Sequence, residues 1–218
     1  MKLAIFDCDG TLVDSQADIC AAMDLAFAAG GFTAPDRAET RRVVGLSLPE
    51  AMRRLHPDGG PSDHQTLAQL YKDAFRSRRE AGQVGEPLYD GIAALIEELA
   101  GDGWLLGVAT GKSDRGLAHC LATHGLAGHF VTLQTADRHP SKPHPSMVDA
   151  CLEATGAARA DTAMIGDTVF DMEMAVNAGV RAIGVDWGYH HPAELVEAGA
   201  EAVAGSMAEL RLLLRGME

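Results

Sequence analysis

Apolar residues follow two different patterns along the chain. Leu3 to Phe6 are four consecutive apolar residues that stop at an acidic loop, which predicts a short buried strand. From about Ser15 to Gly85 the apolar residues recur at helical spacing instead, without a convincing strand. Ser15 with Asp18 resembles a capping box, and Gly30-Gly31 would end the helix that begins there. This segment is therefore expected to consist of helices interrupted by loops, one of them at 56–61.

After Pro87 the two patterns alternate. Short apolar runs predict strands at 104–109, 130–133, 162–165, 182–185 and, more weakly, 202–203. Helical spacing predicts the intervening helices, which begin near 92, after Ser113, and near 147, 169 and 206. Strands and helices that alternate in this way indicate an α/β fold, with a doubly wound, Rossmann-like parallel sheet covered by helices on both faces.

The first strand belongs to this sheet but is separated from the other strands by the helical segment. We therefore expect an α/β catalytic core formed by residues 1–14 and 86–218. The helical segment, residues 15–85, would be an all-helical cap inserted into that core.

Composition narrows the classes of partner. The chain has 218 residues, 47% of them hydrophobic, so it can bury a sizeable core. Its formal net charge of −13 argues against nucleic acid and against an anionic membrane surface, because both carry negative charge themselves. No apolar run approaches the roughly 20 residues of a membrane span. The sequence leaves the oligomeric state open.

Cysteine usage points to a reducing compartment. The four cysteines, at 8, 20, 120 and 151, contain no CxxC pair, so neither a zinc site nor a small disulfide framework is expected. No secretory signal opens the chain, because only four apolar residues follow Lys2 before the first aspartate. We expect a cytoplasmic protein with reduced thiols, in which Cys8 has a packing role.

Polar residues of particular types follow four of the predicted strands. Asp7, Asp9 and Thr11 follow the first strand, and Thr110-Gly111-Lys112-Ser113 follows the second. The other two sets are Lys142, and Gly166-Asp167-Thr168 with Asp171 one helical turn later. The carboxyl ends of parallel strands meet at one edge of a sheet, where ligands bind. Each set alone is weak evidence, since Asp9-Gly10 by itself would read as a turn; their convergence predicts a site.

One competing motif can be set aside. Gly111-Lys112-Ser113 resembles the end of a nucleotide-binding P-loop, which requires a glycine at position 106. Leu106 occupies that position, and Gly107 leaves the loop one residue short.

The four sets together resemble the haloacid dehalogenase superfamily of phosphatases. Their order matches the family's motifs, which are DxDxT at Asp7 to Thr11, a threonine after a strand, a lysine before proline, and GDxxxD at Gly166 to Asp171. Asp14-Ser15 and Lys142-Pro143 look particularly like the phosphoglycolate phosphatase group. The resemblance covers essentially the whole chain, and it implies a Mg²⁺-dependent hydrolase acting on a small phosphorylated metabolite.

The resemblance also implies a role for each site residue. Asp7 would be the nucleophile and form an aspartyl phosphate, and Asp9 would be the general acid and then the general base. Lys142 would neutralise charge between nucleophile and phosphoryl group, and Thr110 with the Gly111 amide would bind phosphate oxygens.

Magnesium prefers oxygen ligands. Asp7, the main-chain carbonyl of Asp9, and Asp167 suit this metal. Asp171 would either orient the metal's water shell or hold Lys142 by an ion pair.

Substrate choice is expected to depend on the cap, because the core handles only the phosphoryl group. The cap residues expected nearest the site are Arg41, Arg42, Gly45 and Ser47. A small anionic substrate such as phosphoglycolate needs a cation there, which either arginine could supply.

Two alternatives stay open. A β-phosphoglucomutase-like enzyme shares the fold, but those enzymes often carry an arginine just after a Gly-x-Ser in the cap, where this chain has Leu48. A phosphorylatable signalling receiver also combines clustered acids, a threonine and a lysine on a parallel sheet, but receivers are much shorter and lack an acid two residues beyond the nucleophile. Dehalogenases likewise lack the second acid, which is Asp9 here.

Overall fold

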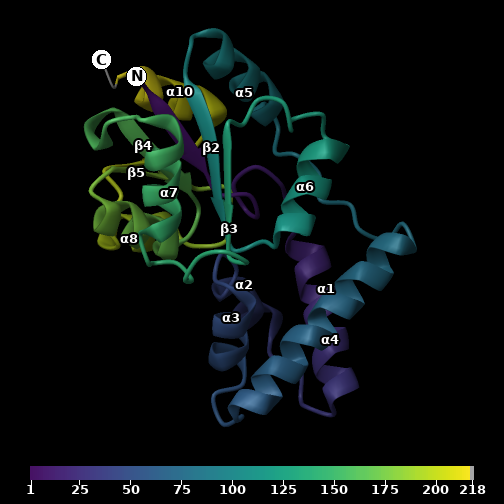
Figure 1. Ribbon diagram of the computed structural model, residues 1–218. Helices are drawn as coiled ribbons and strands as arrows, with labels where there is room; N and C mark the ends of the chain where they lie inside the picture. Colours follow the sequence, from purple (N-terminus) through teal and green to yellow (C-terminus); the bar gives the residue numbers. More distant parts are fainter. Residues whose placement is uncertain (217–218) are drawn as a thin grey trace.

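A six-stranded sheet forms the centre of the computed structural model, which describes residues 1–216 (Figure 1). The strands are β1 (Leu3–Phe6), β2 (Leu105–Thr110), β3 (Thr132–Thr135), β4 (Thr162–Gly166), β5 (Arg181–Val185) and β6 (Ala202–Ala204). All neighbours pair in parallel, in the order β3-β2-β1-β4-β5-β6. The predicted α/β parallel sheet is confirmed.

The direction of winding reverses at β1. The chain moves outward through β2 and β3 on one side of β1 and through β4, β5 and β6 on the other. Phe6, the last residue of β1, is in register with Val108 of β2 and Ile165 of β4. Loops that follow these strands therefore leave at the same edge, at the type of switch point where open α/β sheets bind ligands.

Helices cover both faces of the sheet. On one face lie α5 (Ile92–Gly101), α6 (Asp114–Thr123) and α10 (Met207–Arg215), and on the other α7 (Ser146–Thr155), α8 (Val169–Ala178) and α9 (Pro192–Glu197). A short 3₁₀ helix at Arg159–Asp161 precedes β4. Successive side chains of a strand point to opposite faces, so Ala4 and Phe6 pack in the first layer while Leu3 and Ile5 pack in the second. Because β1 is buried on both faces, all four of its residues are apolar.

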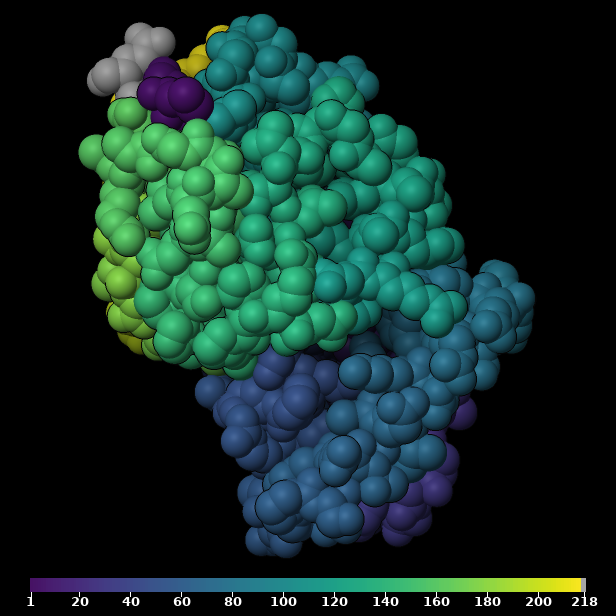
Figure 2. Space-filling view, viewed as in Figure 1, coloured from purple at the N-terminus to yellow at the C-terminus, as the bar shows by residue number. Residues whose placement is uncertain are grey.

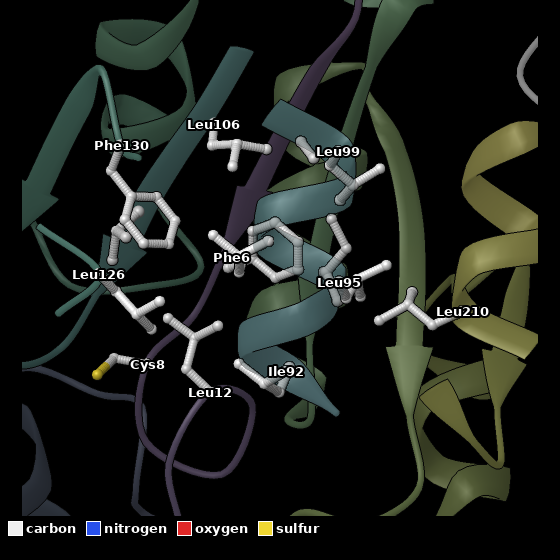
Figure 3. Packing of buried hydrophobic residues seen from close by; sticks show 14 of the residues in the cluster. Phe6, Cys8, Leu12, Ile92, Leu95, Leu99, Leu106, Leu126, Phe130 and Leu210 are labelled. Atoms are coloured by element: carbon white, nitrogen blue, oxygen red, sulfur yellow. The ribbon is translucent and has the colours of Figure 1, made fainter. Parts of the chain in front are cut away.

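Phe6 is at the centre of the first layer (Figure 3). Its ring meets Phe130 edge to face, with centroids 6.5 Å apart, and Leu95 and Leu99 of α5 belong to the same buried cluster. This packing fixes the end of β1, and the loop that begins at Asp7 follows directly from it.

Four helices between β1 and β2 form a separate lobe, which we call the helical lobe (Figures 1 and 2). They are α1 (Gln16–Gly30), α2 (Arg37–Arg42), α3 (Leu48–Leu55) and α4 (Pro61–Glu80). The lobe has its own small core, which includes Met23, Phe27, Met52 and Leu67. The predicted all-helical insertion is confirmed, whereas the domain limits at residues 14 and 86 stay a prediction.

Two features differ from the sequence-based expectation. The strand predicted at 130–133 lies at 132–135, because Phe130 is buried against Phe6 from the turn before the strand, while the edge strand itself is rich in Thr and Gln. Helices α2 and α9 were not predicted, since six residues are too few to show a helical period. Within residues 1–216, every helix is too short or too polar to span a membrane.

Leu95 offers a test of the core. Its side chain is fully buried, so Leu95→Ala should lower the free energy of unfolding by about 2–5 kcal/mol through lost burial and the cavity left behind. The matched control is Leu212→Ala, at a leucine that is 68% exposed, which should change stability by less than about 0.5 kcal/mol. Urea unfolding measures both; equal losses would contradict this description of the core.

Candidate active site

Asp7 is the first residue after β1 and is completely buried. Its amide donates to the carbonyl of Ile165 on β4, at 2.9 Å, which extends the sheet pairing by one residue. Its Oδ1 accepts from the amide of Cys8 at 2.6 Å. Its Oδ2 lies 2.9 Å from Lys142 Nζ as an ion pair but receives no hydrogen bond of suitable geometry within residues 1–216. One oxygen of Asp7 is therefore left with unused ligand capacity.

Lys142 connects Asp7 to Asp171. Its side chain is fully buried, and Nζ donates to Asp171 Oδ1 at 2.6 Å. Asp171 lies in the first turn of α8, where its Oδ2 accepts from the hydroxyl of Thr168 at 2.7 Å. The structure therefore shows the ion-pair alternative for Asp171, which holds Lys142 beside the predicted nucleophile.

Asp167 follows β4 and is also completely buried. Its Oδ1 accepts from Thr11 Oγ1 at 2.8 Å, and its Oδ2 accepts from the amide of Tyr189 at 3.0 Å. Gly10 and Gly188 lie so close that a Cβ on either would overlap the Asp167 carboxylate. Gly10 also has φ +84°, which side chains disfavour, so glycine is needed there on both counts.

These buried carboxylates carry more negative charge than Lys142 can balance. Burial, opposed by Lys142 and reinforced by Asp171, raises the pKa of Asp7 to about 7. Burial, together with Asp171 and Asp7, also raises the pKa of Asp167 well above its ordinary value. Burial disfavours the charge of Lys142, but Asp171 and Asp7 outweigh burial and raise its pKa. The site therefore lacks positive charge.

A divalent cation fits this site. Asp7, Asp167 and Asp171 each offer a carboxylate oxygen, and the three oxygens lie within 4.8 Å of one another. The free ligand capacity of Asp7 Oδ2 and the excess negative charge both suit a hard, oxygen-binding ion such as Mg²⁺. The side chain of Asp9 is outside this cluster, so its predicted contribution to metal binding concerns only its main-chain carbonyl.

Asp9 has different partners. It is 8% exposed, and its Oδ1 accepts from Ser15 Oγ at 2.5 Å and from Lys112 Nζ at 2.6 Å. The predicted capping box at Ser15 is wrong, because that hydroxyl makes no cap hydrogen bond to α1 and donates to Asp9 instead. The hydroxyl of Tyr189 lies 3.1 Å from Ser15 Oγ and extends the same chain of hydrogen bonds.

Thr110 ends β2 at the same edge of the sheet, and Gly111 follows it. Thr110 is 1% exposed, and its hydroxyl oxygen accepts from the amide of Lys112 at 3.3 Å. A Cβ at Gly111 would overlap the carbonyls of Gly45 and Leu46, so a loop of the helical lobe packs directly on this position. Their predicted phosphate-binding roles stay predictions.

The four predicted cap residues are in different surroundings. Gly45 has φ +94°, and a Cβ there would lie 3.8 Å from Asp7 Oδ2, so this loop covers the predicted nucleophile. The amide of Ser47 donates to Ser141 Oγ at 2.8 Å. Arg41 donates to Gln16, and Arg42 forms an exposed ion pair with Glu194. Gly45 and Ser47 line the cavity described next, and neither arginine is among its lining residues within 1–216.

A cavity of about 500 Å³ separates the helical lobe from the sheet edge, and Figure 2 shows a recess at this junction. Asp9 and Gly111 line it from the core, whereas Asp7 lies deeper and is sealed from it. Cations from both sides also line it, namely Lys72, Arg76, Arg79, Lys112 and Arg115. A chain of net charge −13 thus has a locally cationic cavity beside its acidic site.

Sequence reasoning missed two residues of this site. Lys112 was noted in the polar set after the second strand and in the rejected P-loop but was given no role, and Glu86 was given none either, yet Lys112 Nζ lies 2.7 Å from Glu86 Oε1. No sequence signal links residues 26 positions apart on different elements. Cys8, in contrast, has the packing environment that was expected, because it is fully buried with its Sγ 3.9 Å from that of Cys120.

Comparisons with known proteins agree with this geometry. The family model of the haloacid dehalogenase-like hydrolases matches residues 4–185. A Dickeya dadantii protein named "Probable phosphatase IndB" is 34% identical over 95% of this chain and 91% of its own length. A phosphoglycolate phosphatase of Vibrio vulnificus is 28% identical over 96% of this chain and 94% of its own length.

Solved structures agree as well. The crystal structure of a protein described as a predicted phosphatase from Clostridium acetobutylicum superposes with a TM-score of 0.88 at 26% identity, covering 99% of this chain and 98% of that one. The chain belongs to the haloacid dehalogenase-like hydrolase family and is a phosphoric monoester hydrolase. This membership excludes the signalling-receiver alternative.

The raised pKa of Asp7 predicts how stability varies with pH in metal-free protein. Because the folded pKa is about 7 and the ordinary value is 3.8, the folded state holds a proton that the unfolded chain has lost. That stabilisation is complete below the lower value and is lost as pH rises through the higher one. Asparagine cannot ionise, so Asp7→Asn should gain stability relative to the wild type between about pH 4 and pH 8.

The gain should reach at least about 1 kcal/mol, since one pKa unit corresponds to about 1.4 kcal/mol. Urea unfolding in EDTA at both ends of this range measures it. The same stability difference at both pH values would contradict the dominant role of burial at Asp7.

Proposed function

We propose that this member of the haloacid dehalogenase-like hydrolases is a Mg²⁺-dependent phosphatase that acts on a small phosphorylated metabolite through an aspartyl phosphate at Asp7. One observation supports the proposal most strongly. Asp7, Asp9, Lys142 and Asp167 converge at the switch point of the sheet, although they follow three different strands. A cationic cavity beside them can hold the rest of the substrate.

The first half of the reaction breaks the phosphoester bond. A carboxylate oxygen of Asp7 attacks phosphorus, and the bond between phosphorus and the leaving oxygen breaks with its electron pair on oxygen. Asp9 donates a proton to that oxygen, so the product leaves as a neutral alcohol. Lys142, 2.9 Å from Asp7, stays charged and offsets the negative charge that gathers at the phosphoryl group.

The second half regenerates the enzyme. Asp9, now a carboxylate, takes a proton from a water molecule as the water oxygen bonds to phosphorus. The bond between phosphorus and the Asp7 oxygen then breaks, and inorganic phosphate is released. The hydroxyl of Thr110 and the amide of Gly111 would bind phosphate oxygens during both halves, because Thr110 ends β2 and Gly111 follows it and lines the same cavity as Asp9.

Asp7 and Asp167 would hold Mg²⁺ with the main-chain carbonyl of Asp9, and Asp171 would act mainly through Lys142. When bound, the metal supplies positive charge that polarises the phosphoryl oxygens. Thr11 and the Tyr189 amide orient Asp167 for this role, since each donates to one of its carboxylate oxygens.

The charge of the cavity supports an anionic substrate such as phosphoglycolate. Five cations line it against the two acids Asp9 and Asp137. Several relatives at 28% identity are named phosphoglycolate phosphatases. Lys72 and Arg115 are the cations best placed to meet a second anionic group, because neither forms an ion pair within residues 1–216. Arg41 and Arg42 would join them only if the helical lobe moved.

Movement of that lobe is part of the proposal. Asp7 is completely buried beneath the Gly45 loop, so substrate can reach it only when the helical lobe moves away from the sheet edge. Its return would exclude bulk water during transfer. A mutase reaction shares this plan, and an assay for conversion of glucose 1-phosphate to glucose 6-phosphate separates the two activities.

Asp7→Asn is the direct test of the function. The variant loses the nucleophile but keeps the shape of the side chain, so release of phosphate from phosphoglycolate and from p-nitrophenyl phosphate should fall by at least about 10³-fold. Asp102→Asn, at an exposed acid far from the site, is the matched control and should retain activity. Retained activity in Asp7→Asn would refute the proposal.

Asp167→Asn tests the metal. Removing one charge from the buried cluster should weaken Mg²⁺ binding at least about tenfold, measured by thermal shift of metal-free protein during Mg²⁺ titration. EDTA should abolish turnover in the wild type, and added Mg²⁺ should restore it. Full activity in EDTA would rule out the metal-dependent reaction.

A further inference from the structure

Lys112 lies between two acids at the junction of the lobes. Its side chain is 10% exposed, and Nζ is 2.6 Å from Asp9 Oδ1 and 2.7 Å from Glu86 Oε1. Arg79 of α4 approaches the other oxygen of Glu86 at 3.4 Å. These four residues therefore form a charge-balanced row from the helical lobe to Asp9, the proposed acid/base.

The backbone at Glu86 is held in an uncommon conformation. Glu86 has φ +38°, the one non-glycine residue with positive φ within residues 1–216, and it is 4% exposed. Its carbonyl accepts from His124 Nε2 at 2.8 Å. Such a conformation is unfavourable for a residue with a side chain and persists only where the surroundings enforce it. Here it places the Glu86 carboxylate, in the segment that returns from the helical lobe to the core, against Lys112.

Only one of the two carboxylate oxygens of Asp9 accepts hydrogen bonds within residues 1–216. Both donors, Ser15 Oγ and Lys112 Nζ, approach Oδ1, and Oδ2 receives no hydrogen bond within residues 1–216. An oxygen that accepts two hydrogen bonds, one of them from an ammonium group, is a poor place for a proton. A proton on Asp9 is therefore directed to Oδ2, and Asp9 lines the cavity where the leaving group would lie.

We propose that Lys112, held by Glu86, is a positioning residue that fixes the Asp9 carboxylate through Oδ1 and so presents Oδ2 as the atom that protonates the leaving oxygen. The proposal rests on the proposed phosphatase function and adds two residues to it. In the step concerned, the proton moves from Asp9 Oδ2 to the oxygen that receives the electron pair of the broken bond. Lys112 keeps all its protons and does not contact the reacting atoms.

Two aryl esters distinguish positioning of the acid from a general loss of function. Phenyl phosphate and p-nitrophenyl phosphate place nearly the same ring in the cavity, but p-nitrophenolate leaves readily without a proton and phenolate does not. The ratio kcat/KM reports the steps up to formation of the aspartyl phosphate, which include protonation of the leaving group. Damage to the acid should therefore affect phenyl phosphate selectively.

Lys112→Met keeps the length of the side chain and removes its charge. We expect its kcat/KM to fall roughly tenfold more for phenyl phosphate than for p-nitrophenyl phosphate, within the range that general acid catalysis contributes. Lys112→Arg should restore most of the difference, because it retains charge and N–H donors. Lys2→Met is the matched control, since Lys2 packs over Trp104 away from the site, and should leave the ratio of the two esters unchanged.

Equal losses for both esters in Lys112→Met, or no loss for either, would overturn the proposal. Should Lys112→Met fail to fold, Glu86→Gln decides by the same ratio, which should shift in the same direction. If the wild type hydrolyses neither these esters nor phosphoglycolate, the proposed function itself fails, and this outcome is distinct from a wild type that is active and a variant that treats both esters alike.

Discussion

Buried negative charge governs how the residues around Asp7 are arranged. Asp7, Asp167 and Asp171 each present an oxygen within 4.8 Å of the other two, and Lys142 forms ion pairs with Asp7 and Asp171. Burial of like charges is costly unless they are paired or bind a metal. The raised pKa values of Asp7 and Asp167 express that cost. Such a site is suited to bind a divalent cation and a phosphoryl group whose negative charge Lys142 offsets.

Several separate features of the fold position these acidic side chains. The switch of winding at β1 brings the ends of β1 and β4 together, so Asp7 and Asp167 start from neighbouring strands. Glycines at 10 and 188 leave room for the Asp167 carboxylate, where a side chain would overlap it. The first turn of α8 holds Asp171 against Lys142. Asp9 instead accepts hydrogen bonds from Ser15 and Lys112, which separates the carboxylate proposed for proton transfer from those proposed as metal ligand and nucleophile.

The sequence was sufficient for residues that directly follow strands. Asp7, Thr110 and Asp167 end apolar runs, and parallel strands bring such positions to one edge, so their convergence follows from the strand pattern. The sequence could not predict contacts of side chains that have more than one possible partner in the folded protein. Ser15 could cap α1 or bind Asp9, and only the folded loop decides between them. Lys112 and Glu86 meet because the chain returning from the helical lobe crosses the end of β2, which no local pattern encodes. The edge strand β3 was misplaced because it is polar.

If Asp7 carries the phosphoryl group during turnover, that group can be trapped on it. In Asp9→Asn, p-nitrophenyl phosphate needs no acid for its first step, whereas attack by water lacks its base, so the aspartyl phosphate should accumulate. Acid quenching followed by borohydride reduction converts an acyl phosphate to homoserine, which tandem mass spectrometry can locate. Homoserine should form at position 7, and only when substrate is present. Homoserine at another acid, or a burst of p-nitrophenol without homoserine at position 7, would contradict it.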